Sequence, residues 1–104
     1  MVEIIKNNDM SKAEKADAAV IDFNATWCGP CRMLAPVLEE VSEEMKGSVE
    51  FYSCDCDENT ELARKFGIMS IPAVVVLKKA KQAGMNVGFV PKEALVDFIK
   101  SYSK

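Results

Sequence analysis

The apolar run AAVIDFN, residues 18–24, limits the possible folds of this chain more than any other segment. Asp22 is the only charged residue in it. A nearly continuous apolar run of this length is typical of a strand covered on both faces, as the strands of parallel sheets are. We therefore interpret residues 18–24 as a central parallel strand in a sheet that lies between layers of helices.

Strand-like and helix-like patterns alternate along the rest of the chain. Further strands are expected at 2–6, 48–56, 73–77 and 86–89. The expected helices are a short one near Ser11, a long one over 34–45 that Gly47 ends, one over 59–66 with Asn59 as its N-cap, and a last one that begins at Pro91. The early alternation requires parallel pairing, and the last two strands are close enough for a hairpin. The predicted fold class is α/β, with a central mixed five-stranded β-sheet flanked by about four helices.

Length and composition favour one globular domain. The chain has 104 residues, of which 49% are apolar and 28% charged, so we expect a single domain over 1–104. A net charge of −3 disfavours nucleic acid and anionic membranes as partners. No apolar run reaches the length of a membrane span, and the first residues lack the basic and apolar regions of a signal peptide. We expect a cytoplasmic protein.

The chain has four cysteines and no histidine. The absence of an imidazole excludes the usual histidine-assisted serine or cysteine hydrolases. In a reducing compartment, cysteines indicate redox catalysis or metal binding rather than a disulfide framework. One alternative is therefore a four-thiolate zinc site built from Cys28, Cys31, Cys54 and Cys56.

The motif WCGPC, residues 27–31, lies between a predicted strand and a predicted helix. Unpaired N–H groups and the dipole of a helix N-terminus stabilise a thiolate, so Cys28 is the expected nucleophile. Cys31 lies one helical turn further, close enough to form a disulfide with Cys28, and is the expected resolving thiol. Pro30 makes the loop rigid, and Gly29 tolerates the close approach of the two sulfurs.

Asp22 is the third candidate residue. A carboxyl group in an apolar strand is desolvated, which favours its neutral form and enables it to accept a proton near neutral pH. It could deprotonate Cys31. The alternative is a solvated aspartate at the end of the strand, and the pattern alone does not decide between them.

Three segments, VIDFNATWCGPCRMLAPVLEE, FGIMSIPAVVVLKK and VGFV, resemble the thioredoxin family in order along nearly the whole chain. The resemblance implies the thioredoxin fold and a protein dithiol-disulfide oxidoreductase, which acts as a protein-disulfide reductase and electron carrier. It implies a cis peptide bond at Ile71–Pro72 facing the cysteines, with the Ile71 backbone pairing with an extended substrate. It also implies that Trp27, Gly67 and Gly88 belong to an apolar patch around the active sulfur.

The resemblance further implies partners and cofactors. Disulfide-containing proteins would be the substrates, and a thioredoxin reductase would restore the dithiol with electrons from NADPH through a flavin. Both groups would belong to the reductase, since this chain has no GxGxxG motif, and we expect no bound cofactor or metal. An oxidase or isomerase on the same fold is the closest rival function.

The sequence departs from the family pattern at several positions. Asn24 replaces a common tryptophan and Ser53 a common lysine. Because the lysine cation that would favour ionisation is absent, the pKa of Asp22 should be at least as high as in relatives. Ala73 replaces the usual threonine, and Ala80 the glycine of the last hairpin turn. Cys54 and Cys56 lie two residues apart in a predicted strand, which disfavours a disulfide between them. Core packing is their expected role, with a regulatory thiol or metal ligand as alternatives.

Overall fold

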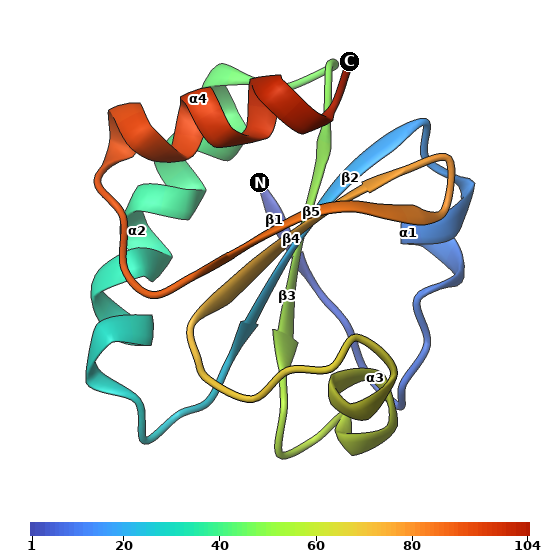
Figure 1. The fold of residues 1–104 in the computed structure, drawn as a ribbon, viewed down its shortest axis with the longest axis vertical. Helices are drawn as coiled ribbons and strands as arrows, with labels where there is room; N and C mark the ends of the chain where they lie inside the picture. The colour runs from blue at the N-terminus through green and yellow to red at the C-terminus, as the bar shows by residue number, and fades with distance from the viewer.

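The computed structural model describes residues 1–104 and places a five-stranded sheet between two layers of helices (Figure 1). The strands are β1 (Val2–Ile4), β2 (Ala18–Asn24), β3 (Glu50–Asp55), β4 (Ala73–Lys78) and β5 (Lys81–Val87). The helices are α1 (Ser11–Lys15), α2 (Gly29–Glu44), α3 (Thr60–Lys65) and α4 (Lys92–Tyr102). This mixed sheet with four helices confirms the predicted fold class. No helix has both the length and the apolar character needed to cross a membrane.

The strand order is β1-β3-β2-β4-β5, so β2 is the central strand. It pairs parallel with β3 on one side and antiparallel with β4 on the other. Residues 18–23 are buried and Asn24 is half-buried, as expected for a strand covered on both faces. The carboxyl end of β2 leads directly into the cysteine motif.

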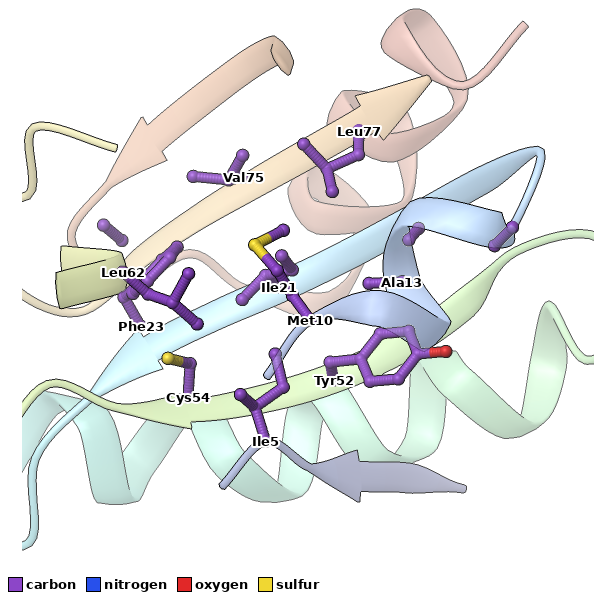
Figure 2. Packing of buried hydrophobic residues seen from close by; sticks show 13 residues of the cluster. Ile5, Met10, Ala13, Ile21, Phe23, Tyr52, Cys54, Leu62, Val75 and Leu77 are labelled. Atoms are coloured by element: carbon purple, nitrogen blue, oxygen red, sulfur yellow. The ribbon is translucent and has the colours of Figure 1, made fainter. Parts of the chain in front are cut away.

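Alternate residues of β2 enter two separate hydrophobic clusters. Ile21 and Phe23 pack into the cluster on the α1 and α3 side of the sheet (Figure 2). Ala18 and Val20 pack into the cluster beneath α2 and α4. Because side chains alternate along a strand, Asp22 lies on the same face as Val20, beneath α2.

The structure corrects the predicted boundaries of several elements. The last strand is longer than expected, Lys81–Val87 rather than 86–89. It is an edge strand with mostly exposed residues, so its first half lacks an apolar pattern. Strands β1 and β3 are shorter than predicted, and Pro91 is the N-cap residue of α4 rather than its first residue.

Ala80 lies in the two-residue turn between β4 and β5. Lys78 pairs with Lys81 across this hairpin, and the intervening Lys79 and Ala80 have φ angles of 52° and 69°. Two residues with positive φ form the turn that suits the right-handed twist of a hairpin. The alanine therefore adopts a left-handed conformation that glycine would adopt without strain.

We expect Ala80→Gly to stabilise the protein. A residue with a Cβ atom is strained by about 1 kcal/mol or more in the left-handed region, and glycine is not. The expected gain is about 1 kcal/mol, or roughly 4–8 °C in melting temperature for a domain of this size. Thermal unfolding followed by circular dichroism measures it. Lys81→Gly, in the adjacent strand, is the control and should lower the melting temperature; an equal effect of both variants would contradict this account.

Candidate active site

Cys28 and Cys31 lie at the N-terminus of α2, as predicted. Cys28 is the N-cap residue, and its Sγ accepts a hydrogen bond of 3.2 Å from the backbone N–H of Cys31. The two cysteines form a disulfide with their Cα atoms 5.2 Å apart. No acidic residue occupies the first turn of α2, and Pro30 lies within that turn. The positive end of the helix therefore acts on the Cys28 sulfur without a competing carboxylate.

The segment Ile71–Pro72 faces this pair. Its peptide bond is cis, as the resemblance implied. The carbonyl oxygen of Ile71 lies 3.9 Å from Cys28 Sγ, and Ile71 packs against the small cluster that contains Cys28 and Cys31. Both cysteines are buried, and the Ile71 segment lies directly against Cys28.

Asp22 is a buried carboxyl group, so its alternative interpretation as a solvated residue is wrong. It is 2% exposed, and its Oδ1 atom has no hydrogen-bond partner. Oδ2 lies 3.4 Å from the side-chain amide of Asn24. Burial raises the pKa of Asp22 to about 6, against the opposing effect of the Asn24 hydrogen bond. The carboxyl group can therefore exchange a proton near neutral pH.

Asp22 and Cys31 line the same cavity. It has a volume of about 340 Å³ and lies between the N-terminal half of α2 and strands β1, β2 and β3. Asn24 and Ser53 also line it. The cavity is large enough for water, and its polar lining offers hydrogen bonds. It provides a path along which a proton could move between Asp22, Cys31 and the solvent.

The thioredoxin sequence profile matches residues 2–101. The chain belongs to the thioredoxin family. Thioredoxin of Bacillus subtilis is 46% identical over 101 residues, which cover 95% of this chain and 97% of that protein. Thioredoxin of Staphylococcus aureus is 41% identical with the same coverage. The crystal structure of Malassezia sympodialis thioredoxin has a TM-score of 0.89 and 34% identity, and covers all of this chain and 92% of its own.

Membership of the thioredoxin family establishes the chemistry of the cysteine motif. The protein is a protein dithiol-disulfide oxidoreductase, and the Cys28–Cys31 disulfide is its redox-active centre. The helix N-terminus at Cys28 favours the thiolate that such exchange requires.

Of the other residues suggested by the thioredoxin resemblance, Trp27 and Gly88 are fixed by hydrogen bonds. Trp27 is 67% exposed, and its indole N–H donates to Asp57 Oδ2 at 2.8 Å. The N–H of Gly88 donates to the carbonyl of Pro72 at 2.7 Å. Gly67 lies in the turn after α3 with a φ of 67°, and no hydrogen bond joins it to the cysteines. Gly88 therefore supports the cis-proline segment directly.

Sequence reasoning missed two residues close to this surface. Asp57 holds the Trp27 indole, and Met69 is 96% exposed only two residues before Ile71. The position of Asp57 just after a parallel strand could have suggested a functional carboxylate, because such residues gather at one edge of the sheet. Met69 gives no such signal in the sequence.

Cys54 and Cys56 are free thiols outside the redox centre. Cys54 is fully buried among the residues in Figure 2, and burial raises its pKa to about 12. Cys56 is half-buried and packs against the same cluster. The predicted core packing is confirmed. The alternative zinc site needed all four cysteines together, but Cys28 and Cys31 belong to a different cluster from Cys54.

We expect the stability advantage of Asp22→Asn over the parent to grow with pH. The folded-state pKa of Asp22 is raised from 3.8 to about 6, so the folded protein holds this proton more tightly than the unfolded chain. The stabilisation that this proton gives the folded protein is complete below pH 3.8, the pKa of Asp22 in the unfolded chain. It is lost as the pH rises through about 6, the pKa in the folded protein. This difference in pKa between the folded and unfolded protein corresponds to about 3 kcal/mol of stability.

Urea denaturation of both oxidised proteins at pH 4 and pH 8 measures this effect. The difference between variant and parent should increase by about 2.5 kcal/mol from the lower to the higher pH, because pH 4 already lies slightly above the pKa of 3.8 in the unfolded chain. Comparing the two proteins cancels the contributions of all other titrating groups. A difference that is the same at both pH values would contradict the assignment of a raised pKa.

Proposed function

We propose that this protein reduces disulfide bonds in other proteins of the cytoplasm. The Cys28 thiolate attacks a substrate disulfide and forms a mixed disulfide with it. Cys31 then displaces the reduced substrate, and the protein leaves with Cys28 bonded to Cys31. Asp22 accepts the proton of Cys31, which creates the second thiolate.

The position of Cys28 at the N-cap of α2 carries this proposal. Its sulfur already accepts a backbone hydrogen bond there, and the same interaction stabilises a thiolate. Cys28 lies at the start of α2 beside the Ile71 carbonyl, whereas Cys31 lies inside the helix, so a substrate on this surface meets Cys28 first. The cavity shared by Asp22 and Cys31 supports the role of Asp22 as their proton acceptor.

The proposed docking surface surrounds Cys28. It consists of Trp27, Gly29, Pro30, Gly67, Ile71, Pro72 and Gly88. Trp27 offers a large exposed apolar face, and the half-buried Ile71 has its carbonyl close to Cys28. An extended substrate segment would pair with the Ile71 backbone and place its disulfide over Cys28.

A thioredoxin reductase is the proposed source of electrons. NADPH and flavin would act in that enzyme and not in this chain, which would bind no cofactor or metal itself. The net charge of −3 supports proteins rather than nucleic acid or an anionic membrane as partners.

A coupled assay tests this function. The protein is mixed with NADPH, a bacterial thioredoxin reductase and insulin as a disulfide substrate, and NADPH oxidation is followed by absorbance. Oxidation should be sustained only when all components are present. A protein that is not reduced by the reductase, or that is reduced but leaves insulin intact, would refute the proposal.

A further inference from the structure

The side-chain amide of Asn24 is fixed beside Asp22 by two groups that do not titrate. Its Nδ2 atom donates to the backbone carbonyl of Asp22 at 3.0 Å and to Ser53 Oγ at 2.8 Å. The same atom lies 3.4 Å from Asp22 Oδ2. Because the two short bonds do not involve the carboxyl group, they hold the amide in place whichever protonation state Asp22 adopts. The partial positive charge of the amide thus always faces Oδ2.

The two oxygens of Asp22 consequently differ. Oδ2 faces a hydrogen-bond donor, whereas Oδ1 is buried and has no partner. A buried acceptor without a partner is costly unless it has a function or meets water. The cavity that Asp22 shares with Cys31 is large enough for water, and the thiol of Cys31 offers a proton for this oxygen to accept.

We propose that Asn24 is a positioning residue that presents Asp22 Oδ1 to the thiol of Cys31. This inference rests on the proposed role of Asp22 as the proton acceptor. Asn24, braced by Ser53, stabilises the ionised carboxylate through Oδ2 and leaves Oδ1 as the free acceptor.

The proton and the electrons balance in the step that Asn24 supports. Asp22 Oδ1 takes the proton of Cys31, directly or through a water molecule in the cavity. The Cys31 thiolate attacks Cys28 Sγ, the sulfur–sulfur bond between Cys28 and the substrate breaks, and the substrate cysteine leaves as a thiolate. Solvent protonates that thiolate, and Asp22 returns its proton to solvent.

Few other charged groups face Asp22. Helix α2 contributes Cys31, Arg32 and Glu39 to the cavity lining, whereas β1 and β3 contribute no charged residue. Cys54, on the opposite face of β3, and Cys56, just after β3, both have a raised pKa and stay neutral in the working range. Arg32 donates to the carbonyl of Thr26 and is exposed, so solvent screens its charge. Asn24 is therefore the principal polar contact of the carboxyl group.

The experiment compares the parent with Asn24→Leu, which removes the donor at similar size. One readout is the carbon-13 NMR titration of the Asp22 carboxyl in the oxidised protein. The other is the pH profile of a single-turnover reduction of a small aromatic disulfide by stopped flow. In Asn24→Leu, we expect the midpoint of the Asp22 titration to move to higher pH. The fall of the single-turnover rate at acid pH should move with it. The rate at pH 5 should fall roughly three- to tenfold, the value of one ordinary hydrogen bond, because the contact between the amide and Oδ2 is long at 3.4 Å. The difference should shrink at higher pH.

Three further variants make the result decisive. Asn24→Gln keeps an amide, so the Asp22 midpoint should move less than it does in Asn24→Leu. Ser53→Ala removes only the group that holds the amide, and it should also move the midpoint less than Asn24→Leu does. Asn24→Ala replaces Asn24→Leu if the latter does not fold. Asp22→Asn should remove the part of the acid limb that follows the Asp22 midpoint and leave the part due to the Cys28 thiol; if the part at the Asp22 midpoint persists, the proposed base role fails and this inference falls with it. If that part disappears in Asp22→Asn but does not move in Asn24→Leu or Asn24→Ala, the inference alone is overturned.

Discussion

Replacing Cys31 with serine is expected to arrest the protein on its substrate as a stable mixed disulfide. Cys28 keeps its position at the N-cap of α2 and can still attack. Serine cannot complete the exchange, because a hydroxyl group is neither ionised near neutral pH nor able to form a disulfide. Steady-state insulin reduction should fall to background. Non-reducing electrophoresis and mass spectrometry should show one substrate chain per protein, released by dithiothreitol.

Cys28→Ser is the matched control. It removes the attacking sulfur and should give neither turnover nor a trapped complex, although Cys31 is still present. Cys31 lies within α2 and lines the cavity of Asp22 rather than the proposed docking surface, so it should not react directly with a folded substrate. Trapping by Cys28→Ser and not by Cys31→Ser would reverse the assignment of the two thiols.

Replacing Asn59 with alanine is expected to cause the largest loss of stability. Asn59 is fully buried in the connection between β3 and α3. Its Oδ1 accepts from the N–H of Asn8 at 2.8 Å, and its Nδ2 donates to the carbonyls of Ile5 and Asp55 at 3.3 Å and 3.0 Å. The side chain therefore ties the segment after β1 to the end of β3. Alanine leaves buried groups without partners, at about 1–3 kcal/mol each.

The expected total for Asn59→Ala is about 3 kcal/mol, or a fall of roughly 10–25 °C in melting temperature. Thermal and urea unfolding measure it. Glu58→Ala, at an exposed neighbour whose side chain makes no hydrogen bond, should change stability by less than about 0.5 kcal/mol. Asn59→Asp is a sharper test, because its carboxylate would face two carbonyl oxygens and destabilise the protein more at pH 7 than at pH 4. A loss below about 1 kcal/mol in Asn59→Ala would contradict this role.

The central elements of the fold could be predicted because burial leaves a clear trace in the sequence. Residues 18–24 are covered on both faces, so their apolar run fixes β2 and its parallel neighbour. Strand β5 was only partly predicted because an exposed edge strand imposes no such pattern. The turn at Ala80 was uncertain for a related reason: a left-handed alanine follows from the hairpin geometry and not from its own preference.

Local pattern located the redox centre but not the polar contacts around it. The positions of Cys28 and Cys31 follow from a strand that leads into a helix, and both lie where expected. Asn59 was predicted as an N-cap. It occupies that position, but its side chain makes no cap hydrogen bond and instead contacts residues more than 50 positions away. The amide of Asn24 likewise reaches Ser53 across β2 and β3. Such contacts depend on tertiary structure, which single-sequence patterns do not encode.

The reduction potential of the Cys28–Cys31 pair tests the proposed direction of electron flow most directly. The protein is equilibrated with a dithiol buffer of known potential, and free thiols are counted by mass spectrometry after alkylation. Cys54 and Cys56 remain reduced and serve as an internal reference for complete alkylation. A protein-disulfide reductase requires a potential more negative than about −260 mV, the reducing end of the glutathione range obtained by extraction from cytosol. A potential above about −180 mV would instead identify an oxidase or isomerase and contradict the account.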